Sequence, residues 1–303
     1  MDIAIIGLGR MGSTIAGRLL DTGNKVVVWN RTRAKTEALS EQGAHPCYHL
    51  HDLPALLTEP RIVWIMLPAG KPTEKALLKL ADILGPGDII IDGGNSRYMD
   101  DPIRSQTLEE KGINYLDIGV SGGVWGREKG FCLMVGGSPQ TFGIVEPILK
   151  DLAPADGYMF CGSHGAGHFV KMIHNGIEYG MMQSYAEGFA LLEHSPFGDD
   201  LDFSSLSHLW NQGSVIRSWL LELAEKGFTN DPKLEQVLPF VDDSGEGRWT
   251  VEHAINSETP APVLTLALME RFRSRQENSF ADRLLATLRN QFGGHPMQLK
   301  KDD

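Results

Sequence analysis

Residues 162–188 carry polar side chains at spacings that could place a proton acceptor and a proton donor on one helix. Lys171, Asn175 and Glu178 stand at positions i, i+4 and i+7, and His174 lies beside them. Because an α-helix has 3.6 residues per turn, these side chains would share one face. An amine and a carboxylate held there could act as general base and general acid. The alternative is a solvated helix face, and the spacing alone does not choose between the two.

The same stretch also contains small and apolar residues. Ile173, Ile177 and Met181 would form an apolar stripe along the expected helix. Gly176 and Gly180 each cost about 1 kcal/mol in a helix interior, so their presence favours close packing over a free surface. We therefore expect a long helix that is buried on one side and carries the polar residues on the other.

The N-terminal stretch has the pattern of a dinucleotide-binding unit. An apolar strand over residues 2–6 is followed by a G-x-G-x-x-G motif, a helical stretch and a second strand over residues 25–29. Glycines in such a turn let the backbone approach a pyrophosphate, and the following helix N-terminus donates amide hydrogen bonds to it. The residues predicted to bind the cofactor at this turn are Gly7, Leu8, Gly9, Arg10, Met11 and Gly12.

The end of the second strand bears on the choice of cofactor. An acidic residue there would bind the ribose hydroxyls of NAD, but the chain has Asn30, Arg31 and Thr32. The guanidinium of Arg31 suits the 2′-phosphate of NADP. NADP is therefore favoured over NAD; the alternative is that Arg31 and Arg33 are both surface charge and that the enzyme takes either cofactor.

Further α/β units follow the first. The strands predicted for them cover residues 61–67, 88–92, 113–117, 131–136 and 158–161. Polar, glycine-rich loops follow two of these strands, and doubly wound sheets bind ligands at the carboxyl ends of their strands. Asn95 in one loop, and Ser121, Gly122 and Gly123 in the other, could bind a carboxylate; ordinary turns are the alternative. The sequence predicts an α/β Rossmann-type domain with a doubly wound sheet over residues 1–162.

Beyond this point the strand signals vanish. Helical periodicity covers residues 201–210, 214–225, 261–273 and 279–292. The segments between them, such as residues 242–247, are polar and predict linkers. The sequence therefore predicts an all-α second domain over residues 163–303, built on the long helix.

Composition excludes several classes of function. The net charge of −11 over 303 residues argues against a nucleic-acid partner. No apolar run is long enough to span a bilayer, and three scattered cysteines predict no disulfide framework. His164 and His168 stand four residues apart, but no acidic or cysteine partner has a ligand spacing to them, so no metal site is predicted. We expect a soluble, cytoplasmic protein without a membrane partner.

Together these motifs resemble the 6-phosphogluconate dehydrogenase family, within the wider β-hydroxyacid dehydrogenase superfamily. The resemblance covers nearly the whole chain. It rests on residues 7–12, 93–96, 119–123 and 168–179, of which the last block is specific to this family. At 303 residues the chain resembles a short form of the enzyme that lacks a second helical repeat.

The resemblance implies oxidative decarboxylation of 6-phosphogluconate to ribulose 5-phosphate, with hydride transfer to NADP or NAD and without a metal. Lys171 would be the general base that takes the 3-hydroxyl proton, for which it must be uncharged. Glu178 would be the general acid that protonates C1 of the enediol. The substrate carboxylate and hydroxyls would be bound by Asn95, Ser121, Gly122, Gly123, His174 and Asn175, with Tyr179 near the phosphate.

The resemblance also implies a homo-oligomer. Arg289 and His295 match a tail motif that reaches the active site of a neighbouring subunit, although the sequence does not choose between dimer and tetramer. On the cofactor side, the resemblance implies contacts from Leu67 and Asn95. Pro68 follows where longer forms often carry Lys, which leaves the coenzyme preference open.

The sequence departs from the family at the residues expected to bind the substrate phosphate. Ser244 and Glu246 stand where longer enzymes have Lys and Thr. An acidic residue is unfavourable beside a phosphate, so either the loop moves or another group compensates. The phosphate-binding arginine of the family has no match in register, although Arg271, Arg273 and Arg275 are nearby.

Two other functions compete with this one. The altered residues 244–246 motivate a dehydrogenase of an unphosphorylated β-hydroxyacid such as 3-hydroxyisobutyrate, while residues 174–179 and the tail motif argue against it. A non-catalytic dinucleotide-binding scaffold or redox sensor is the other alternative. It is motivated only if the polar face of the long helix is structural.

Overall fold

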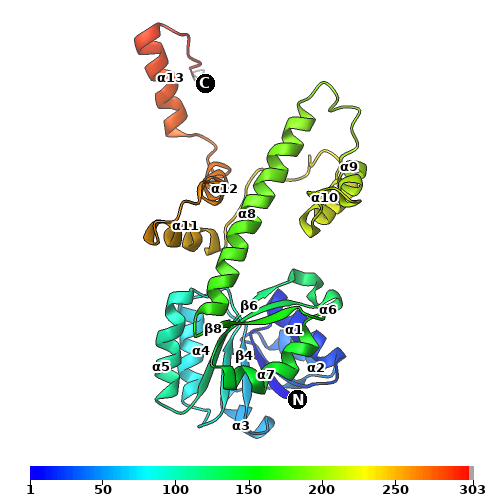
Figure 1. Cartoon of the computed structure of the whole chain (residues 1–303), viewed down its shortest axis with the longest axis vertical. Coiled ribbons are helices and arrows are strands. Elements are labelled where there is room, and N and C mark those ends of the chain that lie inside the picture. The colour runs from blue at the N-terminus through cyan, green and yellow to red at the C-terminus, as the bar shows by residue number, and fades with distance from the viewer. Residues whose placement is uncertain (300–303) are drawn as a thin grey trace. The chain divides into compact units, whose positions relative to one another are not determined.

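The computed structural model describes residues 1–299, apart from the side chain of residue 292. The chain divides into two compact units, Met1–Gly176 and Ile177–Asp303 (Figure 1). The boundary between them falls inside one long helix. Among the described residues, no helix is both long and apolar enough to cross a bilayer.

The first unit is built on one eight-stranded sheet with the order β3-β2-β1-β4-β5-β6-β7-β8. All neighbouring strands are parallel except β6 and β7. The strands are β1 (Asp2–Ile6), β2 (Lys25–Trp29), β3 (His45–Pro46), β4 (Ile62–Ile65), β5 (Ile89–Asp92), β6 (Asn114–Ser121), β7 (Cys132–Gly137) and β8 (Tyr158–Gly162). The order reverses between β1 and β4, which is the switch point where doubly wound sheets bind ligands. The predicted Rossmann-type sheet is confirmed.

The central strands of this sheet are largely apolar, as expected where helices cover both faces. Within β1, Ile3 and Ile5 belong to one core cluster, whereas Ala4 and Ile6 belong to another. Successive side chains of a strand point to opposite faces, so the sheet separates two cores. Figure 1 shows the helices α1 (Arg10–Asp21) and α7 (Pro139–Leu152) on one face and α4 (Lys71–Ala81) and α5 (Asp101–Glu109) on the other.

Several shorter elements of this unit are absent from the sequence prediction. They are α2 (Arg33–Ser40), α3 (Leu53–Leu56), α5, α6 (Gly126–Lys129), the strand β3, and the 3₁₀ turns η1 (Leu50–Asp52), η2 (Tyr98–Asp100) and η3 (Gly123–Trp125). Most span only one or two turns and carry few apolar residues, so their periodicity is weak. Short helices depend on tertiary packing more than on local propensity.

The long helix α8 runs over Ala166–Glu193, where the sequence predicted residues 162–188. Its apolar stripe is not buried as expected, since Ile177 and Met181 are 50% and 39% exposed. The buried residues of α8 include the polar side chains of Lys171 and Asn175 instead. The burial of α8 is therefore the reverse of the expectation at these positions. The polar residues Lys171 and Asn175 are buried, and the apolar residues Ile177 and Met181 are exposed.

The second unit is all-helical, as predicted. Beyond α8 it contains α9 (Phe203–Asn211), α10 (Trp219–Asn230), α11 (Glu246–Asn256), α12 (Pro262–Arg273) and α13 (Phe280–Gly293). The sequence did not predict α11, because its first residues belong to the polar segment expected to be a linker. The buried apolar residues of this unit form two small clusters, one of Phe189, Phe203, Leu221 and Phe228 and the other of Tyr179, Ala267 and Leu268.

Candidate active site

The predicted dinucleotide turn connects β1 to α1 at the switch point of the sheet. Gly7 has a φ of +100°, which residues with a side chain rarely adopt. A Cβ at Gly12 would lie 2.0 Å from the Gly7 carbonyl oxygen, so only glycine fits there. The helix α1 follows Gly9 without a side-chain cap. Its first N–H groups are therefore suited to bind an anion.

Asn30 links the end of β2 to this turn. Its Oδ1 accepts the Leu8 N–H at 3.0 Å, and its amide donates to the Thr32 carbonyl at 3.1 Å. Arg10 and Met11 form the start of α1, and Arg10 is exposed. The structure thus brings the glycine-rich turn and the Asn30 segment together, as an adenosine-binding edge requires.

The two arginines after Asn30 have different surroundings. Arg33 pairs with Glu37 at 2.9 Å, and its guanidinium lies 4.2 Å from the centroid of the Tyr48 ring. Arg31 is exposed and forms no ion pair in the part of the chain that the structure describes. Arg31 is therefore the guanidinium that is available to a cofactor phosphate.

Leu67 follows β4 and lies between the dinucleotide turn and the loop after β5. A Cβ at Gly7 would lie 2.7 Å from the Leu67 Cδ2, and one at Gly94 would lie 2.6 Å from the Leu67 carbonyl oxygen. The neighbouring residue Asn95 is exposed. Leu67 and Asn95, both predicted cofactor contacts, therefore meet at the same edge of the sheet.

The loop that carries Asn95 is fixed by the buried carboxylate of Asp92, which ends β5. Its Oδ1 accepts the Gly94 N–H at 3.0 Å, and its Oδ2 accepts the Ser96 hydroxyl at 2.6 Å. Asp92 was not predicted as a functional residue, because it is the last residue of an apolar strand. A lone carboxylate directly after three isoleucines was the available signal.

Arg104, on α5, connects Asp92 to a second buried carboxylate. Its Nη1 lies 3.0 Å from Asp92 Oδ2 and 3.3 Å from Asp101 Oδ1. Asp101 also accepts the Tyr115 hydroxyl at 2.7 Å, and its Oδ2 lies 2.8 Å from His168 Nδ1. Burial disfavours the charged imidazole, but the adjacent Asp101 outweighs it and raises the pKa of His168 to about 10. The Asp101 carboxylate therefore favours the protonated form of His168.

This network corrects the expectation that His168 has no acidic partner. Possible ligand atoms of Asp92, Asp101 and His168 lie within 4.8 Å of one another. Spacing could not reveal the group, because Asp101 and His168 are 67 positions apart. The guanidinium of Arg104 already gives both carboxylates a cation. We therefore interpret the cluster as an ion-pair network that ties α5, the Asn95 loop and α8 together.

Asp117, within β6, holds the start of α8. Its Oδ1 accepts the Gly165 N–H at 2.7 Å, and its Oδ2 accepts the His168 N–H at 3.0 Å. A carboxylate at this position stabilises the positive end of the helix dipole. Burial raises the pKa of Asp117 above its ordinary value in spite of these donors.

The helix α8 approaches the sheet so closely that glycine is required at the contact. A Cβ at Gly167 would lie 2.4 Å from the Asp117 carbonyl oxygen and 2.5 Å from that of Met134. A Cβ at Gly119 would lie 2.3 Å from the Lys171 Cβ. Lys171 is only 6% exposed. Backbone contact therefore determines where the predicted base lies above the sheet.

One turn after Lys171, α8 meets the loop that follows β6. Ser121 Oγ lies 3.3 Å from His174 Nε2, and His174 Nδ1 lies 3.0 Å from Asn175 Oδ1. Gly122 and Gly123 come next in the loop with φ values of +131° and +56°. The structure thus groups these predicted substrate ligands, although their role in binding remains a prediction.

In the second unit, Tyr179 is surrounded by groups that suit an anion. Its hydroxyl lies 3.4 Å from the Ser244 Oγ and accepts the Ser244 N–H at 3.2 Å. The guanidinium of Arg271 lies over its ring, 3.6 Å from the centroid. No arginine of the sequence stands in register with the family's phosphate-binding residue, but the fold places Arg271 beside Tyr179.

The two carboxylates near this group are placed differently. Glu246 is the first residue of α11 and is 1% exposed, so it does not present its carboxylate to solvent. Glu178 is half-buried on α8, which continues without a break from Lys171. Arg271 supplies a positive charge at Tyr179, and its role as the compensating group for Glu246 stays a prediction.

The predicted tail residues lie at the end of the second unit. Arg289 is exposed on α13, and His295 is exposed just beyond it. The His295 carbonyl accepts the Asn290 amide at 3.0 Å. None of the hydrogen bonds described for the second unit joins Arg289 or His295 to Tyr179. Their contact with a neighbouring subunit stays a prediction.

Family models match both parts of the chain. Residues 2–163 match the NAD binding domain of 6-phosphogluconate dehydrogenase, and residues 167–301 match the 6-phosphogluconate dehydrogenase C-terminal domain. The NAD(+)-dependent, decarboxylating 6-phosphogluconate dehydrogenase of Haloferax volcanii is 40% identical over 304 residues, which cover 100% of both chains. The enzyme of the same name from Bacillus subtilis is 37% identical over 94% of this chain and 64% of its own length.

Solved structures agree with these matches. The 6-phosphogluconate dehydrogenase of Plasmodium falciparum, solved in apo form, with NADP+ and with 6-phosphogluconate, superposes with a TM-score of 0.83 and 29% identity. That match covers 100% of this chain and 67% of the other. A 3-hydroxyisobutyrate dehydrogenase of Mycobacterium tuberculosis has a TM-score of 0.68 at 21% identity, which indicates a shared fold. With its NAD(P)-binding domain and its matching helical domain, the chain belongs to the 6-phosphogluconate dehydrogenase family.

Proposed function

We propose that this chain catalyses the NAD(P)-dependent oxidative decarboxylation of 6-phosphogluconate to ribulose 5-phosphate and carbon dioxide. The observation that carries the proposal is the buried residue Lys171, which packs on Gly119 of β6 and lies on the same helix as His174 and Asn175, in a chain of this family. Burial disfavours the charged form of an amine, and an uncharged amine can take a proton from a hydroxyl.

In the proposed mechanism, Lys171 takes the proton of the substrate 3-hydroxyl while hydride leaves C3. The bound nicotinamide supplies the hydride acceptor. The new ketone lies β to the carboxylate, so it can take up the electron pair that carbon dioxide leaves behind. Glu178 then protonates C1 of the enediol. The carboxylate and hydroxyls are held by Asn95, Ser121, Gly122, Gly123, His174 and Asn175.

The phosphate of the substrate binds, in this proposal, at Tyr179, Ser244 and Arg271. The two hydroxyls can donate hydrogen bonds to phosphate oxygens, and the guanidinium adds a charge-assisted pair. Arg271 also compensates for the loss of the lysine that the longer enzymes carry in this loop. The substrate class that follows is a sugar acid with a terminal phosphate monoester.

Initial rates test the reaction. Reduced nicotinamide should accumulate with 6-phosphogluconate and should not with gluconate, which lacks the phosphate. Turnover of 3-hydroxyisobutyrate in place of 6-phosphogluconate would replace the proposal by the unphosphorylated alternative. If cofactor binds and neither substrate reacts, the chain acts as a dinucleotide-binding scaffold.

We further propose that Arg31 gives the enzyme a preference for NADP. The relatives do not decide this, because two are named for NAD(+) and the Plasmodium structure contains NADP+. Replacing Arg31 by glutamine should lower kcat/KM for NADP by about 10-fold to 100-fold, the value of one charge-assisted hydrogen bond, and leave NAD turnover unchanged. Arg33→Gln is the matched control, because Arg33 is paired with Glu37. A wild-type preference for NAD would contradict the proposal.

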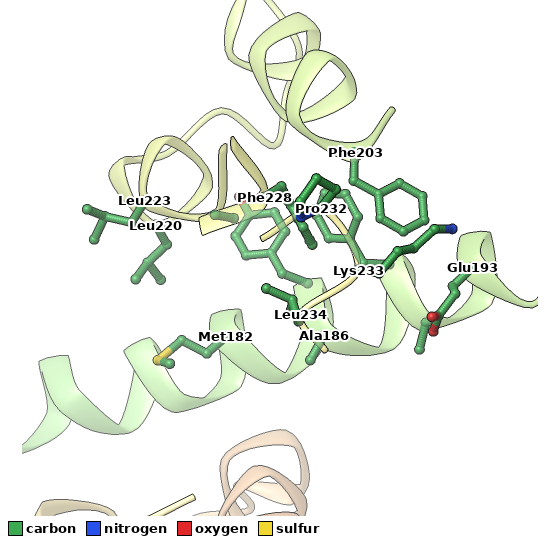
Figure 2. Close-up of a pocket in the computed structure, with 14 residues that line it drawn as sticks. Met182, Ala186, Glu193, Phe203, Leu220, Leu223, Phe228, Pro232, Lys233 and Leu234 are labelled. Atoms are coloured by element: carbon green, nitrogen blue, oxygen red, sulfur yellow. The ribbon is translucent and has the colours of Figure 1, made fainter. Parts of the chain in front are cut away.

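We also propose that the protein is a homo-oligomer assembled through its second unit. This unit has a largely apolar cavity of about 560 Å³, between α8 and α10, with Phe189 and Phe228 in its wall (Figure 2). The helix α13 exposes an apolar side made of Phe280, Leu284, Leu285 and Leu288. Large apolar surfaces of this kind mark protein interfaces. The same helix would carry Arg289 and His295 to a neighbouring site.

Replacing Leu284 by aspartate should therefore weaken the assembly. The charge would have to be buried at the interface, so the molar mass measured by light scattering should fall towards that of one chain at low concentration. Ala286→Asp is the control, since residue 286 lies on the opposite side of α13 and should leave the mass unchanged. A single-chain mass for the wild-type protein would contradict the proposed oligomer.

A further inference from the structure

The loop before α11 is tied to α12 along its backbone. Arg275 Nε donates to the Val241 carbonyl at 2.8 Å, and Val241 N–H donates to the Ser274 Oγ at 3.0 Å. Arg271 Nη1 donates to the Asp242 carbonyl at 2.7 Å. The loop is therefore held along one side, and it presents Ser244 to Tyr179 at a fixed distance.

Asp243 is the centre of this arrangement. Its carboxylate accepts Arg248 Nε at 2.6 Å and Arg248 Nη2 at 3.2 Å, and it accepts Arg275 Nη2 at 2.7 Å. Its side chain is only 5% exposed. The hydrogen bonds from Arg248 outweigh burial and, with those from Arg275, lower the pKa of Asp243 to about 2. One carboxylate thus joins a guanidinium from α11 to one just beyond α12.

The three arginines around the loop therefore differ in whether a carboxylate neutralises their charge. Arg248 and Arg275 share the negative charge of Asp243. Arg271 contacts a carbonyl oxygen, the Tyr179 ring and the sulfur of Met182, all of them neutral. Among the described contacts of these three arginines, Arg271 is the one without a carboxylate. Its charge remains available beside Tyr179 and Ser244.

We propose that Asp243 is a positioning residue that makes the site selective for a phosphate monoester. By binding Arg248 and Arg275 it fixes the loop, so that Ser244 faces Tyr179 and the charge of Arg271 is left for the phosphate. The inference rests on the proposed function, because the phosphate is the terminal group of that substrate. Asp243 lies outside the reacting groups and acts through Ser244 and Arg271.

Steady-state kinetics of Asp243→Asn test this role in the full-length enzyme. Asparagine keeps the size of the side chain but loses the charge that binds two guanidiniums. KM for 6-phosphogluconate should rise by about 10-fold to 100-fold, as expected for losing a charge-assisted contact to the phosphate. Inhibition by inorganic phosphate should weaken in parallel. Because the reaction centre is untouched, kcat and the KM for the nicotinamide cofactor should stay close to wild type.

Asp242→Asn is the matched control. It makes the same charge change one residue away, at an exposed side chain, and keeps the carbonyl that binds Arg271. Asp243→Glu provides a second variant, because it retains the charge and should recover part of the affinity even if the asparagine variant is unstable. Melting curves of all three variants monitor folding.

The outcomes separate this inference from the proposed function. If the wild-type enzyme does not turn over 6-phosphogluconate, the proposed function fails and the inference fails with it. If the wild type is active and Asp243→Asn has an unchanged KM, only the role of Asp243 is overturned. The role of Asp243 is also overturned if kcat, the KM for 6-phosphogluconate and the KM for the nicotinamide cofactor all change together. A general loss of structure would change all three.

Discussion

Replacing Lys171 by methionine is expected to lower kcat for 6-phosphogluconate by about 100-fold to 10,000-fold, the range that general base catalysis contributes. Methionine retains an unbranched, flexible stem that can pack against Gly119, but it cannot accept a proton. The loss should appear in kcat, because the hydroxyl proton moves only in the chemical step. Initial rates at saturating substrate and cofactor measure it.

Cofactor affinity is the internal control for this variant. Lys171 is not among the residues predicted to contact the cofactor, so nucleotide binding measured by fluorescence titration should not change. Lys150→Met is the matched surface control, since Lys150 is 60% exposed and pairs with Glu146. Unchanged turnover in Lys171→Met would remove the catalytic assignment and favour the scaffold.

The largest loss of stability is expected from Asp101→Asn. The amide keeps the shape of the side chain but removes the charge that holds His168 and Arg104. Removing one partner of a buried ion pair costs about 3–5 kcal/mol. The side chains of Asp101 and His168 are 0% and 1% exposed, so water cannot take the place of the carboxylate. Urea denaturation at neutral pH measures the difference in unfolding free energy.

The pH dependence of that difference has a definite sign. The folded-state pKa of His168 is about 10, above its ordinary value of 6.5, so the folded protein binds a proton that the unfolded chain releases. This stabilisation is complete below pH 6.5 and is lost as the pH rises through 10. The stability difference between wild type and Asp101→Asn should therefore shrink over this range.

The neighbouring carboxylate supplies the control for this prediction. Asp100 is 43% exposed and lies 3.7 Å from Arg104, so Asp100→Asn makes the same charge change near the same cation in contact with water. Exposed pairs of this kind contribute little, and we expect a small, pH-independent effect. A difference for Asp101→Asn that does not vary with pH would mean that His168 is uncharged in the folded protein.

The parts of the fold that depend on local patterns could be predicted from the sequence. The glycine motif directly follows an apolar strand, and its spacing alone places Gly7 and Gly12 at the closest approach of the turn. The Lys171 to Glu178 spacing predicted a helix in the same way. Neither prediction needs any knowledge of residues far away in the chain, because strand and helix periods are local properties.

The remaining parts of the candidate site depend on partners that are distant in sequence. Asp101 lies in a stretch where the sequence predicts no element, and only the fold brings it to His168. Arg271 lies on a helix whose orientation determines whether it meets Tyr179. Ile177 and Met181 show a helical period, but a period does not reveal whether anything covers that face. In each of these cases the contact depends on how one element is oriented against another. A local sequence pattern does not contain that information.

The close contact between α8 and the sheet also constrains how the protein can diverge. A Cβ at Gly136 would lie 2.7 Å from the Gly167 nitrogen, and Gly119 leaves no more room beside Lys171. Main-chain atoms thus determine where the side chain of Lys171 leaves the helix. Substitutions among the side chains of the two sheet cores should therefore leave the position of Lys171 unchanged. Adaptation to a new substrate has to proceed through the loops instead, such as residues 121–123 and 241–245.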